Sequence, residues 1–304
     1  MRRRGARSVV LQFPDGLRRR GAALAHALGI EGFEVTLDGN PCYGACDLSH
    51  ETGADILVHV GHTPLGRSDD ERVLFLPLTL DADLAVLSSA LPLLEGRVVG
   101  LVSTAQHAHL LPAAAGFLEE QGLEVRIGGP TPRTPLRGQV LGCSYGAARE
   151  ANTPEVLFLG TGVFHPLGVA LATGARVIAC DPFSGRVEVA DPERLLRQRF
   201  ARIERVKNAS TVGILLSTKT GQRREALARR LAAFDPARAV VIALEEVTPD
   251  ALVNLGFDAY VNTACPRLAY DDGIRFPLPV LAPAEYEIAL GRRGWNDYVV
   301  DECE

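Results

Sequence analysis

The sequence predicts an α/β protein of three similar modules, each with a small parallel sheet flanked by helices, arranged with pseudo-threefold symmetry. One plan occurs three times along the 304 residues: a short apolar run, a polar loop and an amphipathic helix. The apolar runs are rich in β-branched residues and carry few polar ones, which is typical of strands covered on both faces in a parallel sheet. With 47% hydrophobic residues, the chain is also long enough to bury a substantial core.

The predicted elements follow the chain in three groups. Each group opens with a strand and its helix, at residues 9–12 and 17–28, 98–102 and 110–121, and 212–216 and 223–234. Further strands are predicted at residues 34–37, 56–60, 73–76, 125–127, 139–142, 156–159, 176–179, 240–243 and 259–262, and a charged helix at 192–206. We therefore predict a first module at residues 1–90, a second at 91–206 and a third at 207–304.

The alternative architecture is one continuous Rossmann-like sheet followed by a smaller domain. Its GxGxxG fingerprint places three glycines in the turn that cradles a dinucleotide. Gly160-Thr161-Gly162 follows a predicted strand but lacks the third glycine at the required offset. The sequence therefore favours three modules.

Composition excludes several classes of protein. A net charge of −5 leaves no clustered basic excess to neutralise phosphates, so we expect no direct nucleic-acid binding. The sequence has no apolar run of about 18 residues, and the start does not fit a signal peptide, so we expect no membrane span and a cytoplasmic location. Six irregularly spaced cysteines do not resemble a secreted disulfide framework, and reduced thiols or metal ligands are expected instead.

Three cysteines, one in each predicted module, lie shortly after predicted strands: Cys46, Cys143 and Cys265. Ligands collect at the carboxyl ends of parallel strands, so three modules around one axis would point three thiolates at one centre. Thiolate is the usual protein ligand of iron–sulfur clusters, and three thiolates on a [4Fe–4S] cluster leave one iron open to a substrate. For any single cysteine, the alternative is a small buried hydrophobic residue.

The other cysteines fit less well. Cys42 and Cys46 begin the C-x3-C-x2-C signature of radical S-adenosylmethionine enzymes, but Ser49 stands in its third position. A compact zinc site is not predicted, because no second close Cys or His pair follows at zinc-finger spacing. Cys180, at a strand end, is predicted to be structural, and Cys303, close to the chain end, to be incidental.

Two loops are candidate sites for an amino-acid-like cofactor. Gly160, Thr161 and Gly162, followed by His165, leave a strand end where glycines let a ligand approach the backbone. Ser217, Lys219 and Gln222 lie before a predicted helix, whose first amides favour a carboxylate. A solvated capping loop is the alternative for this second segment.

The sequence assigns neither a metal-binding histidine nor a catalytic residue. The candidate histidines could be metal ligands or acids, but each is more often a polar residue satisfied by a neighbouring loop, and we assign none of them to iron: His50, His59, His62 and His165. No hydrolytic triad is recognisable, and no residue is predicted to be catalytic.

Six motifs occur in order through the three modules. They are QFPDG at 12–16, NPCYGACD at 40–47, LGC at 141–143, FLGTG at 158–162 with HPLG at 165–168, STK at 217–219 with GQ at 221–222, and NTACPR at 262–267. Together they resemble the archaeal 2-(3-amino-3-carboxypropyl)histidine synthase family, which performs the first step of diphthamide biosynthesis.

The resemblance implies a homodimer in which each subunit binds a [4Fe–4S] cluster through Cys46, Cys143 and Cys265, with S-adenosylmethionine as cosubstrate. It selects Cys46 over Cys42 as the first ligand, a choice that spacing leaves open. It also implies transfer of the 3-amino-3-carboxypropyl group, as a radical, to a histidine imidazole carbon of translation elongation factor 2. The electron donor is not indicated.

Two other classes of function remain open from the sequence. One is a quinolinate-synthase-like enzyme on a similar three-module plan, in which the open iron acts as a Lewis acid. The other is a non-catalytic iron–sulfur electron carrier or metal sensor.

Overall fold

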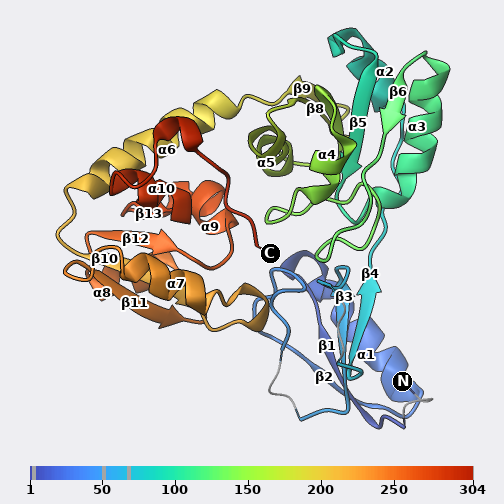
Figure 1. The fold of residues 1–304 in the computed structure, drawn as a ribbon. Coiled ribbons are helices and arrows are strands. Elements are labelled where there is room, and N and C mark those ends of the chain that lie inside the picture. Colours follow the sequence, from blue (N-terminus) through green and yellow to red (C-terminus); the bar gives the residue numbers. More distant parts are fainter. Residues whose placement is uncertain (2–4, 50–52, 67–69, 304) are drawn as a thin grey trace.

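A computed structural model describes residues 1, 5–49, 53–66 and 70–303 of the chain. It contains three separate sheets, which Figure 1 shows grouped around the point where the chain ends. In the part of the chain that the structure describes, no helix combines the length and the apolar character that a membrane crossing requires.

The first sheet has four parallel strands. In spatial order they are β2 (Glu34–Leu37), β1 (Ser8–Gln12), β3 (Ile56–Gly61) and β4 (Val73–Pro77). A 3-10 turn at Asp15–Arg20 leads into helix α1 (Gly21–Ile30), which packs against β2. Val9, Leu11 and Phe13 form the centre of its core.

The second sheet has five strands, and the last of them is antiparallel. In spatial order they are β6 (Glu124–Arg126), β5 (Val98–Ser103), β7 (Glu155–Leu159), β8 (Arg176–Cys180) and β9 (Val187–Val189). Its helices are α2 (Val86–Ala90), α3 (Leu111–Glu120), α4 (Gly146–Ala151) and α5 (Phe164–Thr173), with 3-10 turns at Leu91–Leu93 and Ala108–Leu110.

The third sheet has four parallel strands. In spatial order they are β11 (Ala239–Leu244), β10 (Val212–Ser217), β12 (Ala259–Asn262) and β13 (Val280–Leu281). The helices that precede, connect and follow them are α6 (Pro192–Lys207), α7 (Glu225–Ala232), α8 (Pro249–Leu255), α9 (Arg267–Tyr270) and α10 (Pro283–Ala289). Short 3-10 turns lie at Thr220–Gln222, Asp272–Arg275 and Trp295–Asp297.

All three sheets share one strand order. The first strand of each module lies between the second and the third, and the fourth follows the third. This arrangement places a topological switch point between the first and third strands, where ligands bind in open parallel sheets. The predicted three-module α/β fold is confirmed, and the alternative of one continuous Rossmann-like sheet is wrong.

Local differences from the predicted elements have identifiable causes. The segment 139–142 is not a strand, because Gly138, at φ 68°, and a tight turn from Leu141 to Ser144 bend the chain after a single bridge to Ser103. The short edge strands β9 and β13 were not predicted, because two or three residues carry too little periodicity. The remaining predicted strands are all present.

The second and third modules pack together through helix α6, which contacts α5 of the second as well as elements of the third. Helix α6 packs against α10 and β13, and its buried Arg199 donates to both carboxylate oxygens of Glu285 at 2.8 and 2.5 Å. Breaking such a buried pair from one side costs about 3–5 kcal/mol. Val300, near the chain end, packs in the core of the second sheet. Helix α2 contacts β8 and β9 of the second sheet. The module boundaries at residues 90 and 206 stay predictions.

Candidate metal centre and adjoining pocket

The three predicted ligand cysteines line one cavity of about 240 Å³. Cys46 lies in the loop after β2, Cys143 between β6 and α4, and Cys265 just after β12. Each comes from a different sheet, so the expected convergence at strand ends is observed. The placement is not equivalent, however: the first two follow the second strand of their modules, whereas Cys265 follows the third.

The chemistry of this cavity suits a soft metal. Among the described residues, those that line it provide three thiols and no aspartate or glutamate. Thiolates select iron–sulfur clusters, zinc or copper(I), whereas carboxylates suit hard cations. The donor set therefore fits a cluster held by three cysteines.

Two residues of the third module contact Cys46. The Gln222 amide donates to the Cys46 sulfur at 3.4 Å. Burial raises the pKa of the Cys46 thiol, and the Gln222 hydrogen bond acts in the opposite direction. The backbone of Gly221 lies so close that a Cβ there would stand 2.8 Å from Cys46 Cβ. A glycine at 221 is therefore required for this approach.

Replacing Gly221 by alanine is expected to lower the iron retained after anaerobic reconstitution. The added methyl would force the two loops apart, and overpacking of this kind costs about 1–3 kcal/mol. Gly29→Ala is the matched control, because a Cβ at Gly29 would meet no atom within 4 Å. Iron per chain is the measurement, and equal iron in both variants would show that this contact does not position Cys46.

Cys303 lies beside Cys143, although the sequence predicted it to be incidental. Its backbone N–H donates to the Cys143 carbonyl at 2.9 Å, and the two thiols share a hydrogen bond that raises the pKa of Cys143. Arg224 fixes this end of the chain by binding the Asp301 carboxylate at 2.8 and 2.7 Å. This proximity was not foreseen, because it depends on an ion pair between distant segments, and the dispensability of Cys303 stays a prediction.

The NTACPR motif explains how Cys265 is presented. The Asn262 side chain accepts from the Ala264 N–H at 3.0 Å and donates to the Cys265 carbonyl at 2.8 Å. The turn that follows points the Arg267 N–H at the Cys265 sulfur. Burial raises the pKa of the Cys265 thiol to about 12, so a metal must compete with a firmly held proton.

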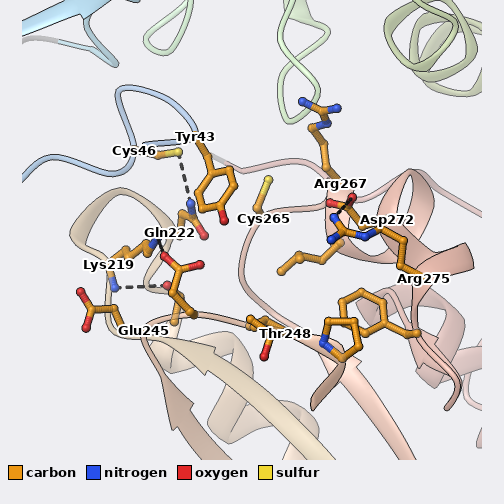
Figure 2. A pocket seen from close by; sticks show the side chains of 16 residues that line it. Tyr43, Cys46, Lys219, Gln222, Glu245, Thr248, Cys265, Arg267, Asp272 and Arg275 are labelled. Carbon is orange, nitrogen blue, oxygen red and sulfur yellow. Dashed lines mark hydrogen bonds and ion pairs between the residues drawn. The ribbon is translucent and has the colours of Figure 1, made fainter. Parts of the chain in front are cut away.

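A second pocket, of about 340 Å³, adjoins the cysteine cavity (Figure 2). The two share Tyr43, Cys46, Cys265 and Arg267 in their walls. The rest of this pocket comes from the third module and carries charges of both signs: Ser217, Lys219, Gln222, Glu245, Glu246, Val247, Thr248, Pro249, Leu268, Asp272, Arg275 and Phe276. A small molecule bound here would lie next to two of the three thiols.

The residues predicted on the 217–222 loop all line this pocket. Lys219 is already engaged, because its ammonium binds Asp47 at 2.8 Å and Glu246, and lies 4.9 Å from the centre of the Tyr43 ring. Since Asp47 follows Cys46 directly, this ion pair ties the third module to the Cys46 loop. Contact of Ser217, Lys219 and Gln222 with a cofactor stays a prediction.

Of the predicted loop at residues 160–165, only part lines the site. His165 lines the cysteine cavity, where burial lowers the pKa of its imidazole to about 4. Gly160, Thr161 and Gly162, though described, line neither this cavity nor the adjoining pocket. His50 lies outside the described residues.

Two arginines near the site were missed from the sequence. Arg133 donates to the Gly221 carbonyl at 3.3 Å, and its charge acts to lower the pKa values of the Cys46 and Cys143 thiols against the effect of burial. Arg275 lines the adjoining pocket and lies 3.4 Å from the Asp272 carboxylate. Neither residue belongs to a recognisable motif, so only the structure could identify them.

The chain resembles known proteins over nearly its whole length. The family model for diphthamide synthesis proteins matches residues 13–300. The chain belongs to this family. A relative in Pyrococcus horikoshii, named 2-(3-amino-3-carboxypropyl)histidine synthase, is 38% identical over 99% of this chain and 90% of its own length. The human relative, 2-(3-amino-3-carboxypropyl)histidine synthase subunit 1, is 34% identical over 96% of this chain and 70% of its own.

A solved structure of a family member agrees with the fold. The crystal structure of Dph2 from Pyrococcus horikoshii with a 4Fe-4S cluster has a TM-score of 0.93 and 38% identity. The similarity covers 99% of this chain and 90% of that one. A family member of this architecture therefore holds a four-iron cluster, the group that the three cysteines of this chain suit.

Proposed function

We propose that this chain is a 2-(3-amino-3-carboxypropyl)histidine synthase, which performs the first step of diphthamide synthesis. It transfers the 3-amino-3-carboxypropyl group of S-adenosylmethionine to a histidine imidazole carbon of translation elongation factor 2. The observation that carries the proposal is the convergence of Cys46, Cys143 and Cys265 on one cavity beside a small-molecule pocket, in a member of this family.

Cys46, Cys143 and Cys265 would hold a [4Fe–4S] cluster, with its fourth iron free of cysteine. When bound and reduced, the cluster supplies an electron to the sulfonium of S-adenosylmethionine. The protein contributes one cavity and three ligands whose positions are fixed from different modules. The loops that carry Cys46 and Cys265 are both held by hydrogen bonds to their neighbours.

The adjoining pocket suits the charges of S-adenosylmethionine. Its volume of about 340 Å³ lies within the usual range for small-molecule sites, about 300–1,000 Å³. Figure 2 shows Arg267 and Arg275 on one side of the pocket and Glu245 on the other. Arginines suit the methionine carboxylate, and acidic side chains suit the ammonium or the sulfonium. We assign the methionine end to this pocket.

The chain's main task is orientation rather than acid–base catalysis. The bond between sulfur and the methionine γ-carbon breaks, giving methylthioadenosine and an aminocarboxypropyl radical, which adds to the imidazole carbon. Loss of one proton to solvent and of one electron, which the oxidised cluster would accept, then restores the aromatic ring. Tyr43 and the Cys265 loop, which border both cavities, would keep solvent away and hold the reacting atoms in line.

The reaction also implies a protein substrate, an assembly and a cellular location. Elongation factor 2 is the protein substrate, a homodimer is the expected assembly, and the cytoplasm is the location where both proteins would meet. Neither membrane nor nucleic acid has a part in this reaction.

The proposed function predicts a defined change in mass of elongation factor 2. After anaerobic reconstitution, incubation with S-adenosylmethionine, dithionite and elongation factor 2 should add one aminocarboxypropyl group to a single histidine. Mass spectrometry of the acceptor peptide is the measurement. An electron carrier would leave the acceptor unchanged, and formation of quinolinate from iminoaspartate and dihydroxyacetone phosphate would support the Lewis-acid alternative.

A further inference from the structure

A second group of metal-binding side chains lies in the first module. The Cys42 sulfur and one ring nitrogen each of His59 and His62 all lie within 4.8 Å of one another. Cys42 is 4% exposed and His59 is fully buried. None of the three is among the cluster ligands assigned above.

The backbone of the first sheet brings these groups together. His59 lies in β3 directly beside Gln12 of β1, at the switch point between the first and third strands. Gly61, at φ 97°, turns the chain so that His62 folds back with its Nδ1 2.9 Å from His59 Nε2. Cys42 arrives on the loop after β2. The three groups therefore meet at the edge of the sheet where ligands are expected.

Gln12 fixes which nitrogen of His59 is free to bind. The Gln12 amide nitrogen donates to the Asp47 carbonyl at 2.8 Å, so the Gln12 oxygen must face His59. This oxygen accepts the proton of His59 Nδ1 at 2.8 Å, which leaves the lone pair of Nε2 directed at His62. Metal-binding imidazoles commonly donate from their second ring nitrogen to an oxygen acceptor, a role that the Gln12 oxygen can fill here.

The surroundings of the Cys42 sulfur also suit a metal ligand. The Gly44 N–H donates to Cys42, as amides commonly do to metal-bound thiolates. Ligand atoms around tetrahedral zinc lie about 3.3–3.8 Å apart for bonds of about 2.0–2.3 Å, so modest side-chain shifts would complete the site. The Phe75 ring, 5.4 Å from that of His59, gives it an apolar flank.

We propose that Cys42, His59 and His62 hold one divalent ion of the zinc class, separate from the cluster. One thiolate and two imidazoles are ligands that zinc prefers, and three protein ligands leave a fourth position for water. On binding, the Cys42 thiol releases its proton to solvent. The proton on His62 Nδ1 moves to Nε2, so both imidazoles stay neutral. The ion would brace the β2 and β3 loops, and His62 also lines the cysteine cavity.

The test measures zinc and iron separately in the reconstituted protein. After equilibration with Zn²⁺ alone and removal of excess, wild type should retain about one zinc per chain by elemental analysis. Cys42→Ser and His59→Gln, neither of which alters a residue lining the cysteine cavity, should each weaken zinc affinity at least about tenfold while keeping their iron. Cys180→Ser is the matched control, because Cys180 is equally buried but lies in the core of the second sheet. Wild type without zinc would overturn the proposal.

A second measurement excludes zinc that occupies the cluster ligands. In the full chain with C46A, C143A and C265A, Co²⁺ alone should still give thiolate-to-cobalt absorbance, and adding Cys42→Ser should remove it. Loss of this absorbance in the triple variant would show that the metal used the cluster cysteines and would overturn the proposal. Neither result of the cobalt experiment depends on iron binding or on the transfer reaction. A failure of the zinc proposal is therefore distinguishable from a failure of the proposed function.

Discussion

Replacing Cys46, Cys143 or Cys265 by alanine, each alone, is expected to remove most of the iron that the reconstituted protein retains. The three sulfurs line one cavity, whereas Cys42, on the Cys46 loop, and Cys303, beside Cys143, do not line it and so do not replace a lost ligand in its position. Loss of a residue that only hydrogen-bonds a metal ligand costs about 10–100-fold in metal affinity. Loss of the ligand itself should cost at least as much. Iron per chain and the thiolate-to-iron absorbance are the measurements.

The remaining cysteines provide the controls for this series. Cys180→Ala should keep the cluster, because Cys180 is buried in the core of the second sheet. Cys303→Ala should also keep it, since Cys303 does not line the cavity although it touches Cys143. A cluster that survived Cys46→Ala but not Cys42→Ala would show that the first ligand was assigned to the wrong member of the C-x3-C pair.

The fold was predictable because its signals are local. The first strand of each sheet is a short apolar run followed by a helix, and that pattern needs no knowledge of distant residues. Convergence of the cysteines also followed, because strand ends gather at one edge of a sheet. Cys143 shows the limit of this reasoning: its expected strand is a bent loop, yet the loop still carries the thiol into the cavity.

The features that escaped prediction depend on contacts between distant segments. Cys303 reaches the site through the Arg224–Asp301 pair, which joins residues 77 positions apart. Contact of Lys219 with a cofactor stays a prediction, but the ion pair of its ammonium with Asp47 of another module was not foreseen. A charged residue on a loop has many partners within reach, and only the assembled structure decides among them.

The second expected result concerns which bond of S-adenosylmethionine breaks. Under the proposed function, reduction with dithionite should yield methylthioadenosine as the main nucleoside product, with little 5′-deoxyadenosine. Three carbons are attached to the sulfonium, and the walls of the binding site decide which of them faces the cysteine cavity. Placing the methionine end in the pocket beside Cys46 and Cys265 directs the γ-carbon side toward that cavity.

The ligand arrangement gives this expectation its physical basis. In the usual signature, three cysteines of one loop hold the cluster, but here Ser49 stands in the third position and the thiols come from three sheets. The surroundings of the open iron are therefore built from different elements, and S-adenosylmethionine need not lie in the usual orientation. Chromatography of the quenched reaction separates the two nucleosides. Cys265→Ala should give neither of them, whereas Cys180→Ala should give the wild-type ratio. Dominant 5′-deoxyadenosine from the wild type would contradict the assignment of the methionine end to this pocket, and with it the proposed transfer.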